Sequence, residues 1–241
     1  MTTEALFDIS PSADSWHTSR LVGFDLETTG PDPSTALIVS AALVIYDPEH
    51  PPATRRPRVR EWLVDPGVEI PAESTAVHGI TTEHARAHGQ PPEEALPQLL
   101  DALRAEFDAG SVIVVMNAPY DLTVLAVEAR RCGLDFPDPH SIIDPLVIDK
   151  QVDKYRRGKR TLAHLCAHYG IVLDGAHSAA PDAEAAVDVA RALARQYPQV
   201  QLPAAEIHAL QAQWKAEQAA DLQEYFRRTR PDAVVNPAWP M

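Results

Sequence analysis

Two carboxylates separated by one residue end the first apolar segment, in the run FDLETTG at residues 24–30. If that segment is a β-strand, the alternation of side chains points Asp25 and Glu27 to the same face. Carboxylates held side by side repel each other, and a divalent cation such as Mg²⁺ or Mn²⁺ relieves that repulsion through hard oxygen ligands. The pair therefore fits a metal site, with two solvated acids at a strand end as the ordinary alternative.

Two later segments also place an acid where a helix is about to begin. Asp121 ends the run NAPYD, which follows an apolar segment, and Asp182 ends the run HSAAPD. We assign Asn117 as the N-cap of the first of these helices, and His177 to a loop before the second. Acids in a first turn are also favoured by the helix dipole, so each segment alone has a purely structural explanation.

The elements that must position these acids change character along the chain. Apolar, β-branched segments at residues 20–25, 37–46 and 59–64 predict three strands. A Pro- and Arg-rich stretch at 51–57 predicts the turn between the second and the third. Consecutive strands joined by short connections predict an antiparallel meander.

After residue 90 the chain alternates between helical periodicity and a short apolar run. Leu96, Leu99, Leu100 and Leu103, for example, share one helical face. The predicted elements are helices at 92–107, 120–132, 161–169, 181–197 and 204–228, and a strand at 111–116. Three strands followed by this alternation predict an α/β fold, a mixed sheet with helices on its faces.

Composition excludes several classes of protein. The 241 residues include 21 Lys+Arg against 34 Asp+Glu, a formal net charge of −13. An acid excess argues against a protein that coats nucleic acid by net charge alone, and 45% hydrophobic residues exclude wholesale disorder. No apolar run approaches the ~18 residues of a membrane helix, and we expect no secretory signal. Cys132 and Cys166 form no CxxC pair, so we expect a reducing, cytoplasmic location without disulfides.

Taken in order, the motifs DxExTG, NAxxD and HxAxxD resemble the DEDD superfamily of 3′–5′ exonucleases. The match is to its DEDDh, DnaQ-like branch, to which the epsilon subunit of bacterial DNA polymerase III and ribonuclease T belong. His177 stands five residues before Asp182, as that branch requires, and the tyrosine branch would need Tyr where this chain has Ser178. The resemblance covers about residues 19–197. It implies a ribonuclease H-like fold: a mixed five-stranded sheet, its first three strands an antiparallel meander, with helices on both faces.

The resemblance also implies roles for the motif residues. The four acids would hold two divalent ions, Mg²⁺ or Mn²⁺: Asp25 would bind both, Glu27 and Asp182 the first, and Asp121 the second. His177 would be the general base that takes a proton from the attacking water, because the pKa of a histidine lies near working pH. The products would be nucleoside 5′-monophosphates, released one at a time.

A pocket for the terminal nucleotide is implied as well. Leu26 would pack beside the last base, Thr28 and Glu27 would contact the 3′-hydroxyl, and the run VHGIT from Val77 would line the base pocket. Ordinary packing is the alternative for His78 and Tyr120. The predicted substrate-binding residues are Leu26, Thr28, Val77, His78, Asn117 and Tyr120.

Residues 150–160 concentrate positive charge, with six Lys or Arg side chains and one Asp in an otherwise acidic chain. Such a loop can hold the phosphates of the strand being digested, although a solvated surface loop is the commoner explanation. The phosphate-contact candidates are Lys154, Arg156, Arg157, Lys159 and Arg160.

These observations predict residues 1–18 as a flexible leader, 19–198 as an exonuclease domain and 199–241 as a C-terminal helical extension with a Pro-containing tail. The predicted activity is 3′–5′ exonucleolytic cleavage of single-stranded nucleic acid, DNA favoured, in replication or repair. Trimming of RNA 3′ ends and a catalytically silent binding or scaffold module are the alternatives, and the five intact motif positions argue against the second. An endonuclease of the same fold would lack the second and third motifs. We predict no membrane partner; a polymerase partner and the oligomeric state stay open.

Overall fold

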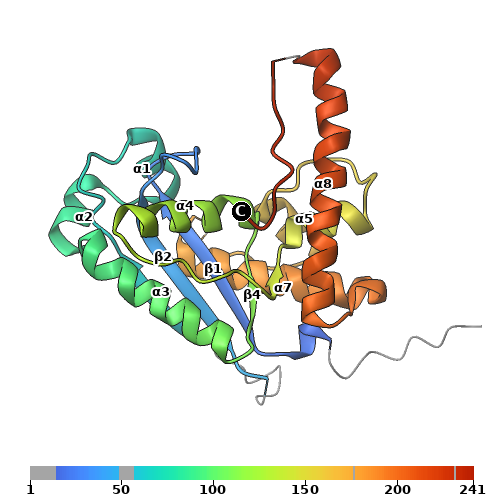
Figure 1. The fold of residues 1–241 in the computed structure, drawn as a ribbon, viewed down its shortest axis with the longest axis horizontal. Helices are drawn as coiled ribbons and strands as arrows, with labels where there is room; N and C mark the ends of the chain where they lie inside the picture. The colour runs from blue at the N-terminus through green and yellow to red at the C-terminus, as the bar shows by residue number, and fades with distance from the viewer. Residues whose placement is uncertain (1–14, 49–56, 176, 231) are drawn as a thin grey trace, which may run out of the picture.

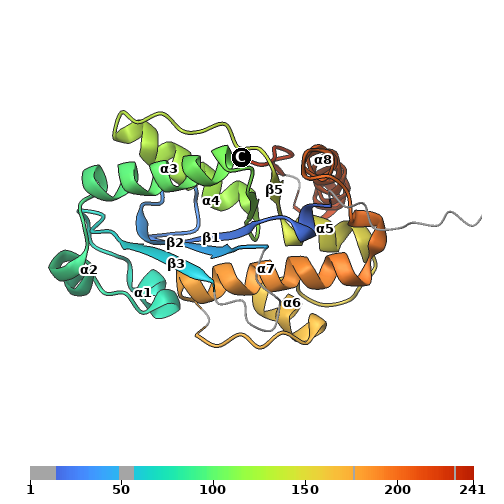
Figure 2. The same ribbon diagram turned by 90° about the horizontal axis from the view of Figure 1, so that it is seen from below.

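A five-stranded sheet in the order β3-β2-β1-β4-β5 forms the centre of the protein (Figures 1 and 2). The computed structural model describes residues 15–48, 57–175, 177–230 and 232–241. β1 and β2, and β2 and β3, pair antiparallel, whereas β4 runs parallel to β1 and β5 parallel to β4. The strands are β1 Leu21–Thr28, β2 Ile38–Tyr46, β3 Arg58–Leu63, β4 Val112–Val114 and β5 Ile142–Ile143. The predicted mixed sheet with its antiparallel meander is confirmed.

Helices cover both faces of this sheet, α3 and α4 on one side and α6 and α7 on the other (Figure 2). Two large apolar cores result among the described residues, one on each face, as alternation along the strands requires, and a small third cluster surrounds Val39. The helices are α1 Ala72–His78, α2 Thr82–His88, α3 Pro92–Asp108, α4 Ala118–Arg131, α5 Pro145–Val152, α6 Leu162–Tyr169, α7 Ala179–Gln196 and α8 Ala204–Thr229, with 3₁₀ turns η1 Trp16–Thr18 and η3 Pro198–Val200.

The long helices coincide with the predicted ones to within two residues at each end, whereas α1, α2, α5 and β5 were not predicted. These elements have two to eight residues, too few to establish a clear apolar period. A capping signal marks two of them. The side chain of Thr81 accepts from the His84 N–H at the start of α2, and Asp144 precedes Pro145 at the start of α5.

Residues 15–18, assigned above to a flexible leader, are instead part of the packed domain. Trp16 is fully buried, and its indole N–H donates to the carbonyl of Val200 over 2.8 Å. The main chain of Trp16 also donates to Leu202 O over 3.0 Å, which ties this turn to the segment before α8. Residues 1–14 of the predicted leader, and residues 51–56 of the predicted turn, lie outside the described residues.

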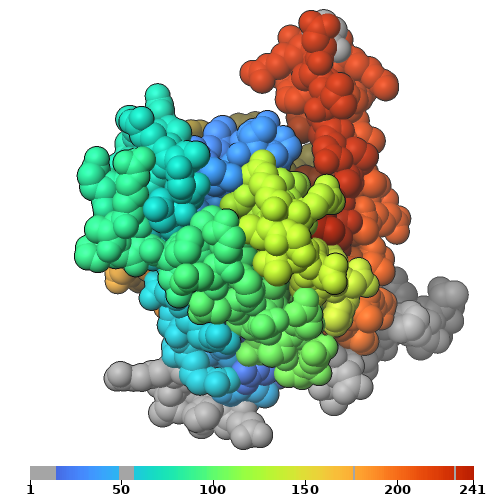
Figure 3. Space-filling view, turned by 60° about the vertical axis from the view of Figure 1, so that its left-hand side comes forward, coloured from blue at the N-terminus to red at the C-terminus, as the bar shows by residue number. Residues whose placement is uncertain are grey.

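The C-terminal helix α8 has 26 residues, a length of about 39 Å at 1.5 Å per residue. Its first half packs on the edge of the sheet, and its second half projects beyond the domain (Figures 1 and 3). The tail runs back along the helix, where the Gln223 side chain donates to Ala233 O and accepts from Val235 N. Across the described part of the chain, no helix is both long and apolar enough to cross a bilayer.

Candidate active site

Three motif acids converge at the end of β1. Each of Asp25, Glu27 and Asp182 offers a carboxylate oxygen, and these oxygens all lie within 4.8 Å of one another. Gly23 allows this approach of α7 to β1, because a Cβ there would lie 2.3 Å from the carbonyl oxygen of Ala183. The residue two before Asp25 therefore brings the first turn of α7, and with it Asp182, against the strand.

Asp182 retains an unsatisfied oxygen in this cluster. Its Oδ2 accepts from the His177 backbone N–H over 3.1 Å, whereas its Oδ1 is buried and has no hydrogen-bond partner among the described residues. Buried carboxylate oxygens are costly to leave unpaired, so an oxygen in this state beside two further acids fits a bound divalent cation. Hard oxygen donors of this kind suit such an ion.

Asp121 adjoins the cluster from the first turn of α4. It is buried, and its Oδ1 accepts from the backbone N–H of Leu26 over 3.1 Å, between the two strand acids. This bond fixes the fourth motif acid to β1 itself. All four predicted metal-binding acids thus meet at one place, although Asp121 is not one of the three whose oxygens lie within 4.8 Å.

The pKa values of all four motif acids are raised, and burial is the main cause. Burial raises the pKa of Asp25 well above its usual range, and the charges of Asp121 and Glu27 raise it further. Burial, followed by the charge of Asp182, raises the pKa of Glu27 to about 7. Burial likewise raises the pKa values of Asp121 and Asp182. The cluster holds too much negative charge for its surroundings, which a cation would correct.

The start of α4 is built differently from the prediction. Asn117 occupies the N-cap position, but in a left-handed conformation (φ 64°) and without a side-chain capping bond. The cap comes from Asp144, whose carboxylate accepts from the backbone N–H groups of Asn117 and Ala118, both over 3.0 Å. The predicted N-cap position of Asn117 is confirmed, but its side chain makes no capping bond, because a buried acid 27 residues later accepts from these donors instead.

His177 lies on the exposed loop before α7, with a left-handed backbone (φ 66°). Burial raises the pKa of Asp182, and the hydrogen bond from the His177 backbone N–H, followed by the charge of His177, lowers it by less. The histidine therefore neighbours the acid cluster, and its role as a general base stays a prediction.

A pocket of about 330 Å³ opens next to the acids. Five of the six predicted substrate-binding residues line it, and Asn117 does not. Sequence reasoning found Val77 and His78 of α1 but missed Glu73 and Ser74 of the same helix, because the helix itself was not predicted. The predicted residues in its wall are Leu26, Thr28, Val77, His78 and Tyr120, together with Glu27.

Two of these residues have polar atoms committed to the pocket's structure. The Tyr120 hydroxyl donates to Gly30 O and contacts the hydroxyl of Thr28, so it holds the turn after β1. His78 is buried, and its Nδ1 accepts from the Ile80 N–H over 3.1 Å. Burial lowers the pKa of His78. A backbone hydrogen bond with Thr28 raises this pKa by a smaller amount, which places the imidazole against the end of β1.

The basic segment is partly consumed by internal ion pairs. Arg156 and Arg160 both pair with the fully buried Asp149, which also accepts from the Tyr169 hydroxyl over 2.7 Å. Lys154 pairs with Asp221 of α8 over 2.8 Å. Three of the five phosphate-contact candidates are therefore already paired, which leaves the exposed Arg157 and Lys159.

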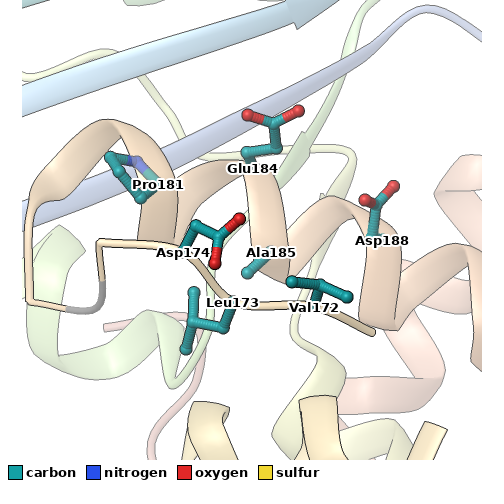
Figure 4. A pocket seen from close by; sticks show the side chains of 7 residues that line it. All are labelled: Val172, Leu173, Asp174, Pro181, Glu184, Ala185 and Asp188. Carbon is teal, nitrogen blue, oxygen red and sulfur yellow. The ribbon is translucent and has the colours of Figure 1, made fainter. Parts of the chain in front are cut away.

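A second pocket, of about 250 Å³, lies against α7 and includes none of the predicted site residues (Figure 4). Its walls carry Asp174, Glu184 and Asp188. Glu184 accepts from the Tyr46 hydroxyl over 2.9 Å, and Asp188 lies 3.4 Å from Arg191. Two of its three acids thus have side-chain partners, whereas among the described residues no side-chain donor is bonded to Asp25, Glu27 or Asp182.

A family model described as Exonuclease matches residues 22–190, a segment that contains every motif acid. The chain belongs to this exonuclease family. Relatives by sequence include a DNA polymerase III subunit epsilon-like protein of Rhodobacter capsulatus (31% identity over 173 residues) and a PolC-type DNA polymerase III of Streptococcus suis (32% identity over 169 residues). These matches cover 69% and 68% of this exonuclease-family chain, and 22% and 10% of the two relatives.

Solved structures share the fold. Exonuclease I of E. coli, in a zinc-bound complex with single-stranded DNA, superimposes with a TM-score of 0.62 at 20% identity, over 76% of this chain and 42% of that one. Exonuclease I of Methylocaldum szegediense gives 0.61 at 19% identity, over 86% and 46%. The predicted ribonuclease H-like fold and the resemblance to DnaQ-like exonucleases are confirmed.

Proposed function

We propose that this chain is a DEDDh-type 3′–5′ exonuclease that removes nucleoside 5′-monophosphates from single-stranded nucleic acid, DNA favoured. The observation that carries the proposal is the acid cluster of Asp25, Glu27 and Asp182, in which one oxygen of Asp182 has no partner among the described residues and Glu27 also lines the adjacent pocket. Bound cations would neutralise the negative charge of this cluster. The phosphodiester of a substrate in the adjacent pocket would contact the same cations.

Two divalent ions, Mg²⁺ or Mn²⁺, would supply charge stabilisation for the attacking and leaving oxygens of the phosphodiester. Asp25, Glu27 and Asp182 would hold one of them, and Asp121 would support the other. Leu26 and Tyr120 would enclose the terminal base, and Thr28 would contact the 3′-hydroxyl. His177 would accept the proton of the attacking water from its exposed loop.

The strand behind the scissile bond needs cationic contacts, because a single strand is bound largely through its phosphates. Arg157 and Lys159 are exposed. Tyr155, which lies between the ion-paired Lys154 and Arg156, is 89% exposed. An exposed aromatic ring offers a base a stacking surface beside these cations.

Single-stranded DNA in complexes of the structural neighbours supports the DNA preference. A cytoplasmic location and a polymerase partner belong to the same proposal, supported by the epsilon-like and PolC-type relatives.

The test is a gel assay on matched DNA and RNA single strands, labelled at the 5′ end, with Mg²⁺, Mn²⁺ or EDTA. We expect a metal-dependent ladder that shortens from the 3′ end, faster on DNA. Asp182→Asn should abolish it, whereas Asp174→Asn, which neutralises an exposed acid outside the cluster, should not. A ladder on RNA alone would make the chain an exoribonuclease. Internal cuts, or binding without cleavage of either strand, would overturn the proposal.

His177 has its own test within this assay. Loss of a general base typically costs 10²–10⁴-fold, so His177→Ala should reduce turnover by at least about 10²-fold while Mn²⁺ binding is retained. Unchanged turnover would show that another group activates the water.

A further inference from the structure

We propose that Gln211 of α8, acting through Asp144, is a positioning residue for Asp121. The inference rests on the proposed function, because it concerns the acid assigned there to metal binding. It makes the C-terminal helix, which was predicted as an extension beyond the exonuclease domain, a structural part of the active site.

The first step of the argument is the double cap made by Asp144. This side chain is fully buried, and its two oxygens accept from Asn117 N and Ala118 N at the start of α4. Its Oδ1 also accepts from Leu146 N over 2.9 Å at the start of α5. One carboxylate therefore fixes the first turns of two helices, and the first turn of α4 carries Asp121.

The second step is the contact between Gln211 and Asp144. Gln211 is fully buried, and its Oε1 accepts from the Asp144 backbone N–H over 2.7 Å. Its Nε2 donates to Ile142 O over 2.9 Å and to Ile207 O over 3.1 Å. Both ends of the amide are thus committed, which gives this side chain one orientation.

The third step concerns the edge of the sheet. β5 is an edge strand with two residues, and such strands leave unpaired backbone groups on their outer side. Gln211 pairs with the outward Ile142 O and Asp144 N, and His208 Nδ1 accepts from Ile142 N over 3.1 Å. Side chains of α8 therefore replace the missing neighbouring strand and fix the position of Asp144.

The consequence reaches Asp121 because the junction in front of α4 is conformationally demanding. Asn117 holds a left-handed backbone (φ 64°), a state that persists for a non-glycine residue when its surroundings impose it. The two bonds from Asp144 impose it here. Without a fixed Asp144, the first turn of α4 is free to shift, and cation binding depends closely on the position of each ligand.

The test compares Gln211→Met with Gln218→Met. Gln218 lies two turns further along α8 and donates to Val147 O over 3.0 Å, so its loss removes a similar bond between α8 and α5 without contact to Asp144. Mn²⁺ affinity is measured from the electron paramagnetic resonance signal of free Mn²⁺, alongside kcat, KM and Tm. Both variants should fold.

We expect Gln211→Met to weaken Mn²⁺ binding and lower kcat, each within the 10–100-fold range typical of residues that orient metal ligands, with KM little changed. Gln218→Met should match wild type in both. If Gln211→Met fails to fold, Asp144→Asn keeps the side-chain volume, replaces an acceptor oxygen by an amide, and should weaken Mn²⁺ binding in the same way.

A lower Tm with wild-type Mn²⁺ affinity and kcat in the folded variants would overturn the inference, since that result describes a merely structural role. Asp121→Asn separates this failure from failure of the proposed function. If Asp121→Asn loses Mn²⁺ and activity while Gln211→Met keeps both, only the positioning role is wrong. If wild type neither binds Mn²⁺ nor cleaves, the proposed function fails.

Discussion

Two groups of buried acids in this protein differ in whether neighbouring side chains neutralise their negative charge. Asp149 is fully buried, but Arg156, Arg160 and the Tyr169 hydroxyl surround it and satisfy its charge. Asp25, Glu27 and Asp182 are partly or fully buried next to one another, and within the described residues no ion pair joins them to Lys or Arg. Asp149 is thus paired by the chain itself, whereas the proposed function assigns the neutralisation of the cluster at β1 to a bound cation. The comparison distinguishes an acid that stabilises the fold from acids that we propose bind a cation.

The first way to break this comparison is Asp121→Asn, which should have the largest effect on activity. Cleavage should fall below detection, because a metal-binding acid is lost. Tm in the absence of metal should stay equal or rise, because an uncompensated buried acid is removed. Gel cleavage and thermal melts in EDTA measure the two quantities. An active variant would remove Asp121 from the site, and a large fall in Tm would assign it to structure instead.

Asp149→Asn should produce the reverse pattern. Removing one partner of a buried ion pair typically costs 3–5 kcal/mol, and we expect a loss of about this size in the free energy of unfolding. The kcat per folded molecule should change little. Urea titration measures the loss, and Asp153→Asn is the matched control. Asp153 also pairs with Arg156 but is partly exposed, so its removal should cost about 1 kcal/mol or less. Equal losses in both variants would refute the special standing of Asp149.

The pH dependence of stability sharpens the same contrast. The pKa of Glu27 is about 7 in the folded protein, above its unfolded value of 4.5, so the folded state binds more protons between these values. Stability in EDTA should therefore fall as pH rises from 4.5 through 7. Mg²⁺ should raise Tm more at pH 8 than at pH 5.5, since binding requires ionised ligands. A Mg²⁺ effect independent of pH, measured by differential scanning calorimetry, would contradict the proposed ligands.

The smallest predicted effect concerns the cations left unpaired in the basic segment. Replacing Arg157 and Lys159 by Gln should raise KM severalfold and leave kcat unchanged. Each phosphate contact on a single strand contributes about −0.7 to the slope of log affinity against log salt, so the double variant should flatten that slope by about 1.4. Binding isotherms at several salt concentrations measure it. If neither KM nor the slope changes, the segment is a solvated surface.

The motif acids were predictable because each lies in a short recognisable motif and the three motifs occur in one order. Asp25 and Glu27 share a strand face, and Asp121 and Asp182 stand at helix starts, but only the resemblance of the combined motifs to a family indicated that the four acids meet. The long helices and the meander followed from periodicity in the same way.

What the sequence could not disclose depends on contacts between distant segments. The cap from Asp144 to Asn117 and the bond from Gln211 to Asp144 join residues 27 and 67 positions apart. Counting charges along the sequence was enough to find the basic segment. Which of its cations are left unpaired depends on Asp149, because this buried acid binds two of them, and its burial follows from tertiary packing. Trp16 is similar, since the hydrogen bonds that hold it join it to Val200 and Leu202, in the segment before α8.

The central claim, that the acids at β1 bind a divalent cation, is tested most directly by calorimetric titration of Mn²⁺ at pH 6.5 in two buffers of different ionisation enthalpy. Because burial and mutual repulsion raise the pKa values of these acids, with Glu27 at about 7, some are protonated at this pH and must release protons to bind a cation. The account predicts saturable binding whose heat depends on the buffer, and its loss in Asp121→Asn. Absence of binding, or binding without proton release that persists in Asp121→Asn, would contradict it.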